Sequence, residues 1–110
     1  MPHEAAFHYD LERSQDDTGW KTVTIHCHGR LISEDTAGLR ALVQPLIAEG
    51  GHIILDFGDL EYLDSSGLGA LVGLKVSAIN KGLCKLNLLN LTPRVKKLLS
   101  ITNLTQLFSE

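Results

Sequence analysis

The 110-residue chain has few cysteines, little net charge and no long apolar run, and each shortage excludes a class of protein. Its two cysteines, Cys27 and Cys84, lie far apart in apolar segments. Because the N-terminus lacks the basic start and apolar run of a secretory signal, we expect two buried thiols and no disulfide. No segment approaches the roughly 20 apolar residues of a membrane span. These absences predict a cytoplasmic protein without direct membrane insertion.

The net charge is only −3, with ten basic and thirteen acidic residues. The basic residues are scattered, apart from Arg94, Lys96 and Lys97, so the chain lacks the positive surface that binds nucleic acid. Hydrophobic residues make up 44% of the chain and charged residues 21%, which argues against disorder or a coiled coil. A chain of this size supports one modest core, so residues 1–110 are expected to form a single domain.

Residue periodicity predicts the order of strands and helices. Apolar residues alternate with polar ones on both sides of the turn-rich segment 14–19, which indicates an N-terminal β-hairpin. The apolar run Ile53–Leu55 is typical of a strand buried on both faces of a parallel sheet, and Lys85–Leu89 is a further strand. With three helical patterns, the last starting at Thr92-Pro93, the order predicts an α/β fold. The hairpin leads into a mixed, mainly parallel sheet covered by helices on both faces.

The first helical pattern covers 39–47, and Ser33 or Asp35 can act as its N-cap. Pro45 lies inside this pattern. Proline removes a backbone donor, so we expect it to kink the helix or split it near Leu42.

The middle helix, from Ser66 to Asn80, carries an apolar stripe that we expect to face the core. The stripe consists of Leu68, Leu71, Val72, Val76 and Ile79. Three glycines, Gly67, Gly69 and Gly73, would let this helix approach its neighbours closely. Lys75 falls within the stripe, and we expect it to bury its stem and keep its ammonium in water.

The most informative segment of the chain is Leu60–Gly69. An apolar run ends there in Asp64, two hydroxyls and two glycines, just before the middle helix. A serine hydroxyl is therefore placed at a helix N-terminus, where unpaired N–H groups and a partial positive charge would stabilise an attached phosphate. This placement favours a phosphorylation switch over a catalytic site.

Other chemistries fit the residues less well. Ser66 lacks the glycine two positions earlier that a nucleophile elbow requires, and no histidine follows it, so a hydrolase is not expected. His26 and His28 share one strand face without a third ligand at a recognised spacing, so no metal is expected. Gly67-Leu68-Gly69 matches part of a phosphate-binding loop, but Val72 replaces the third glycine and no Walker lysine follows. A nucleotide-binding sensor is one alternative, and no cofactor is predicted otherwise.

Asp64-Ser65-Ser66-Gly67-Leu68-Gly69, reached from Ile53-Ile54-Leu55-Asp56-Phe57, resembles the hallmark of the STAS domain, specifically of bacterial anti-sigma-factor antagonists. The resemblance covers nearly the whole chain. It also includes Gly29, the helix start at 36–40, the loop near Gly82 and the segment 92–99. Such a resemblance implies a binding module that catalyses nothing itself.

The resemblance implies a partner-switching cycle. The unmodified chain would bind an anti-sigma factor that is also its serine kinase, and would so free a sigma factor. Phosphorylation would end that binding, and a PP2C-type phosphatase would reset the cycle. By position the phosphoacceptor is Ser66, in a loop with Asp64, Ser65 and Gly67, and we expect Ser65 to cap the helix or to hydrogen-bond locally.

The partner surface is predicted on the side of the middle helix opposite the apolar stripe. The residues on that side are Ser66, Ala70, Gly73, Leu74 and Ser77. A phosphate on Ser66 adds about −1.5 to −2 charges beside Asp64. A docked surface fitted to a neutral hydroxyl would then face a desolvated dianion, which opposes binding.

Two departures from the family pattern matter. Many antagonists carry an aspartate shortly after the glycine that ends the second strand, whereas Gly29-Arg30-Leu31-Ile32 has none. Glu34 or Asp35 could replace it in partner binding, or both could be helix N-terminal acids. The chain also stops at Leu107–Glu110, so the family's final strand and closing helix are short or missing. An apolar surface left uncovered there would invite a homodimer.

A constitutive STAS scaffold is the second alternative function, for instance an accessory subunit of a lipid-transport ABC complex. The two hydroxyls and the complete Ser66–Gly69 segment favour the switch. The missing aspartate after Gly29 favours divergence towards another partner.

Overall fold

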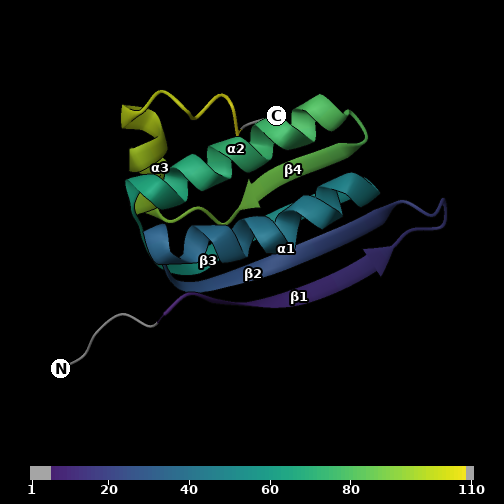
Figure 1. Ribbon diagram of the computed structural model, residues 1–110, viewed down its shortest axis with the longest axis horizontal. Helices are drawn as coiled ribbons and strands as arrows, with labels where there is room; N and C mark the ends of the chain where they lie inside the picture. Colours follow the sequence, from purple (N-terminus) through teal and green to yellow (C-terminus); the bar gives the residue numbers. More distant parts are fainter. Residues whose placement is uncertain (1–5, 109–110) are drawn as a thin grey trace.

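The computed structural model describes residues 6–108, which form one four-stranded sheet with three α-helices (Figure 1). The elements in chain order are β1 (His8–Gln15), β2 (Lys21–Leu31), the 3₁₀ turn η1 (Ser33–Asp35), α1 (Thr36–Glu49), β3 (Gly51–Leu63), α2 (Ser65–Lys81), β4 (Cys84–Leu89) and α3 (Pro93–Ile101). The strands lie in the order β1-β2-β3-β4; β1 is antiparallel to β2, and the other neighbours are parallel. The predicted α/β fold with its N-terminal hairpin is confirmed. Within residues 6–108, no helix is long and apolar enough to cross a membrane.

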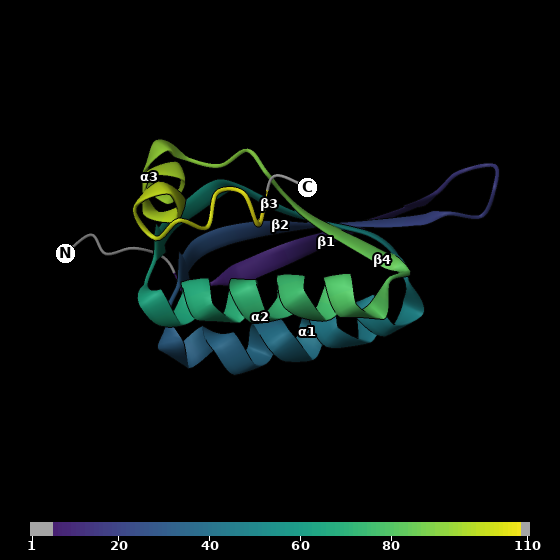
Figure 2. The ribbon, with the colours of Figure 1, turned by 90° about the horizontal axis from the view of Figure 1, so that it is seen from above.

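The two long helices cover the same face of the sheet. Figure 2 shows α1 and α2 side by side beneath the strands, with α3 on the opposite face near one end. Burial in β3 alternates accordingly: Ile53 and Leu55 are 1% and 0% exposed, whereas Ile54 between them is only half-buried. The prediction that Ile53–Leu55 is buried on both faces is therefore wrong, because α3 covers only one end of the second face.

Helix α1 runs without a break from Thr36 to Glu49, so the predicted split near Leu42 does not occur. Pro45 and Ala41 are both exposed. The Ala41 carbonyl, which loses its helical donor to the proline, can therefore bond to water.

Helix α2 buries only part of the predicted stripe, with Leu68 and Leu71 at 7% and 0% exposed. Val76 and Ile79 of the expected stripe are 42% and 52% exposed. Ala70, Leu74 and Ala78 are buried in their place, at 0%, 1% and 1% exposed. Because α2 packs against α1 as well as against the sheet, its buried arc is turned towards α1.

Lys75 lies inside the fold, which contradicts the prediction that its ammonium stays in water. Its side chain is 4% exposed, and Nζ donates a hydrogen bond to the Leu86 carbonyl oxygen of β4 at 2.7 Å. A buried ammonium needs such acceptors to offset its lost hydration. The two cysteines are free and buried, as predicted, and burial raises the pKa of Cys27 to about 12.

Gly67 lies where α2 meets the end of β2 closely. A Cβ at this position would lie 2.6 Å from the Leu31 carbonyl oxygen and 2.7 Å from Cδ1 of Leu63. A Cβ added at Gly69 or Gly73 would meet no atom within 4 Å. Of the three glycines expected to permit close packing, Gly67 alone does so.

We expect Gly67→Ala to lower the free energy of unfolding by about 1–3 kcal/mol, because its methyl group would overlap backbone that cannot move away easily. Gly69→Ala is the matched control on the exposed side of the same helix. It should raise stability by up to about 1 kcal/mol, since alanine favours a helix over glycine. Urea unfolding of both variants measures the difference, and equal effects would contradict the close approach at Gly67.

Candidate functional site

Asp64 is the N-cap of α2 and joins two loops. Its Oδ1 accepts a hydrogen bond from the Gly67 N–H at 2.8 Å, and its Oδ2 accepts one from the Ser33 N–H at 3.2 Å. Its own N–H donates to the Leu31 carbonyl oxygen at 3.2 Å. The prediction that Ser65 caps the helix is wrong. The N-cap is the residue before the first helical one, which is Asp64, and its side chain reaches the amide of the third helical residue, Gly67. The loop after β2 is thereby held against the start of α2.

Ser65 and Ser66 are the first two residues of α2, and both are exposed. Neither hydroxyl takes part in a hydrogen bond with the described residues. The next two N–H groups, of Gly67 and Leu68, bond to the side chain and carbonyl of Asp64. The N–H groups of the two serines are in the first turn and have no acceptor within the helix. The Ser66 hydroxyl is therefore accessible at the positive end of the α2 dipole.

The two acidic residues considered as substitutes for the family aspartate lie in η1, beside this site, but they behave differently. Asp35 is half-buried, and its Oδ2 accepts a hydrogen bond from the Ile32 N–H at 3.2 Å. Glu34 is exposed and forms no hydrogen bond or ion pair within residues 6–108. Asp35 shapes the turn, whereas the Glu34 carboxylate is open to solvent.

Only part of the predicted partner surface can be reached from solvent. Gly73 is exposed and Ser77 is half-buried. Ala70 and Leu74, at 0% and 1% exposed, are wrong as contact residues, because α1 and the sheet cover them. The exposed side of α2 is formed by Ser66, Gly69, Gly73, Val76 and Asn80. All of these side chains are uncharged.

His26 bridges carboxylates of both neighbouring strands, an arrangement that the sequence analysis did not foresee. Its Nδ1 lies 2.7 Å from Asp56 Oδ2 on β3, and its Nε2 lies 2.9 Å from Glu12 Oε1 on β1. Asp56 is held in turn by the Gly58 N–H at 3.0 Å and by Nδ2 of Asn90 at 3.1 Å. Carboxylates only accept, so both ring nitrogens can donate only in the imidazolium form.

His28 repeats this arrangement two residues further along β2. Its Nδ1 lies 2.6 Å from Asp59 Oδ2, and its Nε2 lies 3.0 Å from Asp10 Oδ2. The hydrogen bond to Glu12, followed by that to Asp56, raises the pKa of His26. Asp59 in the same way raises the pKa of His28. We call these six side chains the histidine–carboxylate ladder: Asp10, Glu12, His26, His28, Asp56 and Asp59.

The ladder has a sequence signal, although a weak one. Asp10 with Glu12 and His26 with His28 have the same two-residue spacing, which places each pair on one strand face. The register that joins them, with Asp10 opposite His26 and His28 opposite Asp59, comes from the sheet. In the described residues, no group of three or more His, Cys, Asp or Glu side chains is placed to hold a metal ion.

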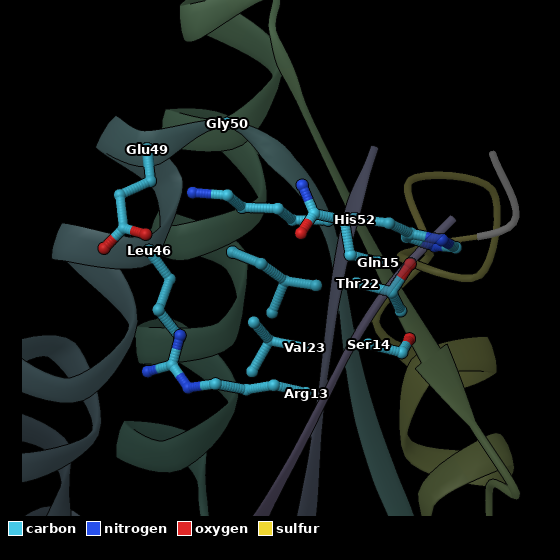
Figure 3. A pocket seen from close by; sticks show the side chains of 11 residues that line it. Arg13, Ser14, Gln15, Thr22, Val23, Leu46, Glu49, Gly50 and His52 are labelled. Atoms are coloured by element: carbon cyan, nitrogen blue, oxygen red, sulfur yellow. The ribbon is translucent and has the colours of Figure 1, made fainter. Parts of the chain in front are cut away.

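A hollow of about 360 Å³ lies between the hairpin and the end of α1, at the opposite end of the sheet from Asp64. Val23, Leu46 and Ile53 contribute its apolar lining. Figure 3 shows Arg13 reaching across it on the same side as Leu46 and Glu49. None of the hollow's lining residues belongs to the Asp64 site.

Comparison with known proteins agrees with this fold. The STAS domain family model matches residues 10–109, and the chain therefore belongs to the STAS domain family. A STAS-domain containing protein of Pseudomonas aeruginosa is 31% identical over 86 residues, covering 78% of this chain and 84% of that protein. The anti-sigma-B factor antagonist of Bacillus subtilis is 28% identical over 95 residues, covering 86% of this chain and 82% of that protein.

Among solved structures, the chain is similar to the anti-sigma factor antagonist SpoIIAA in two forms. The unphosphorylated form has a TM-score of 0.70 and 29% identity, covering 90% of this chain and 84% of that one. The phosphorylated form, from Bacillus, has a TM-score of 0.68 and 27% identity, covering 90% and 86%. The predicted relationship to anti-sigma-factor antagonists is confirmed.

We expect Asp64→Ala to lower the free energy of unfolding by about 1–2 kcal/mol, because it removes the N-cap acceptor of α2. Asp64→Asn should cost less, since asparagine also caps helices well. Urea unfolding gives the stabilities, and amide hydrogen exchange of Ser33 reports whether the two loops stay joined. Unchanged Ser33 exchange in Asp64→Ala would contradict the bridging role.

The ladder predicts that stability falls as pH rises. A histidine whose pKa is raised on folding contributes stability fully below its unfolded pKa, near 6.5, and loses that contribution as pH passes its folded pKa. Chemical unfolding from about pH 5.5 to about pH 8.5 starts below the unfolded pKa and follows the decline upwards. The double variant His26→Gln, His28→Gln should show a weaker decline over the same range. A wild-type decline no steeper than that of the double variant would contradict the assignment.

Proposed function

We propose that the chain is an anti-sigma-factor antagonist whose partner binding is switched by phosphorylation of Ser66. The observation that carries the proposal is the exposed, unbonded Ser66 hydroxyl in the first turn of α2, beside the Asp64 cap. The relationship to the anti-sigma-B factor antagonist and to SpoIIAA, which has an unphosphorylated and a phosphorylated form, supports it.

The partners follow from this role. The unmodified chain binds an anti-sigma factor that is also its serine kinase, and a PP2C-type phosphatase restores the free hydroxyl. The chain acts in the cytoplasm as substrate and binding module, and performs no chemistry of its own.

The partner surface of this proposal is the exposed side of α2 with the neighbouring η1 turn. Gly69 and Gly73 let a partner approach the helix backbone, and Val76 offers an apolar contact. Ser77 lies at the edge of this surface. Glu34, exposed in the η1 turn that contacts α2, supplies a carboxylate in place of the family's aspartate. The exposed side of α2 is itself uncharged, which suits the neutral Ser66 hydroxyl at its start.

Phosphorylation changes this surface while leaving the fold intact. The start of α2 tolerates a dianion, because its first N–H groups and its dipole are favourable to negative charge. A docked partner would have to desolvate that dianion close to the carboxylates of Asp64 and Glu34. The phosphate therefore weakens partner binding without destabilising the fold.

The proposal is tested by mapping phosphate on the protein isolated from its native cells and by measuring binding to its kinase. Ser66→Ala should carry no phosphate and bind permanently, and Ser66→Asp should bind at least about tenfold more weakly, a difference of about 1.4 kcal/mol. Ser65→Ala is the matched control and should be phosphorylated and released like the wild type. Phosphate on Ser65 alone, or equal binding by both Ser66 variants, would contradict the proposal.

A further inference from the structure

Strand β1 is an exposed sheet edge that carries apolar side chains. All eight of its residues are exposed, and no described element lies along its outer side (Figure 1). Tyr9 and Leu11 are 43% and 41% exposed. Backbone N–H and C=O groups along such an edge are a template for another strand, and apolar side chains beside them strengthen the pairing.

The charges that usually protect an edge are directed away from this one. Asp10 and Glu12 bond back across the sheet to His28 and His26 of β2. Both carboxylates are therefore partly neutralised and are held over the sheet, on the face opposite α1 and α2. Charged side chains discourage edge pairing only when they would meet an approaching strand unpaired.

The helix-side face of β1 is formed by alternate residues. Tyr9, Leu11 and Arg13 pair with Cys27, Ile25 and Val23 of β2, which are all buried on that face. Arg13 reaches into the hollow beside α1 (Figure 3) and has no ion pair within residues 6–108. This face therefore offers two apolar side chains and one cation to an added strand.

The strand that best fits this edge is β1 of a second copy. Antiparallel pairing about a two-fold axis at Asp10 places Tyr9 opposite Leu11 twice on the helix-side face. On the other face it places His8 opposite Glu12 twice, which is a favourable pairing. An axis at Leu11 would instead place Asp10 opposite Glu12 twice, and like charges directly opposite are destabilising.

The Asp10 axis has two further features. It places Arg13 of one copy opposite Phe7 of the other, a residue just before β1. It leaves one contact between like charges, that of Asp10 with its own copy, whereas the Leu11 axis leaves two; the carboxylates are bonded to histidines of β2 in both registers. The strand is thus self-complementary in one register, as an isologous dimer requires.

We propose that the chain forms a homodimer by antiparallel pairing of β1 with β1 about Asp10, joining two sheets into one. The interface lies at the sheet edge opposite β4, away from Ser66 and the exposed side of α2. The dimer would therefore present two free partner surfaces, and it stands or falls independently of the proposed switch.

Sedimentation velocity of the full chain over a rising concentration series tests the association. The wild type should shift from monomer to dimer. Leu11→Glu should stay monomeric, because it places a carboxylate opposite Tyr9 at the interface. Ile101→Glu, at a 68% exposed position of α3, is the matched control and should dimerise like the wild type. A wild type that stays monomeric at every concentration, or a dimeric Leu11→Glu, would overturn the proposal.

Cysteine cross-linking tests the register. Under mild oxidation, Asp10→Cys should form a disulfide-linked dimer, since residues directly opposite on paired strands have Cβ atoms about 4.5–5.5 Å apart. Ser14→Cys lies on the same strand, but its two copies would be about 26 Å apart and should not link. The wild type controls for the buried thiols of Cys27 and Cys84. Equal linking of the two variants would overturn the register.

Discussion

The carboxylate of Asp64 is the group on which the candidate site depends. Through its two oxygens it starts α2 and ties the loop after β2 to the same point, and Gly67 permits the contact by leaving no Cβ against Leu31. The N–H groups of Ser65 and Ser66 have no acceptor within the helix. Because the cap is a side chain of the fold itself, the site needs no partner to be formed.

The uncharged surface beside Ser66 results from the way α2 packs. Between Ser65 and Asn80 the only charged residue of α2 is Lys75, and the fold buries it against the Leu86 carbonyl. The exposed side is left with small and apolar residues. On such a surface a phosphate is the dominant change in local charge, so a modification of one atom can decide whether a desolvated contact forms.

Charge on the other face of the sheet is arranged differently. Two histidines of β2 draw carboxylates from β1 and β3 into a ladder, so the stability of the hairpin and the protonation of the histidines are linked. The same hydrogen bonds hold Asp10 and Glu12 over the sheet, which leaves the outer edge of β1 less protected. One set of contacts thus bears on both the pH dependence of the fold and the proposed pairing of two copies.

The sequence by itself determined the α/β order, the hairpin, the two buried thiols and the serine at the start of α2, because these depend on local periodicity and on short-range capping. Tertiary structure decided which side of α2 is buried. Val76 and Ile79 have the same helical spacing as core residues, and only the position of α1 shows that Leu74 is covered in their place. It also decided that Asp64 caps α2 while reaching Ser33, and that the histidines meet four carboxylates. Those contacts join residues far apart in the chain, and strand register, which no local pattern specifies, brings them together.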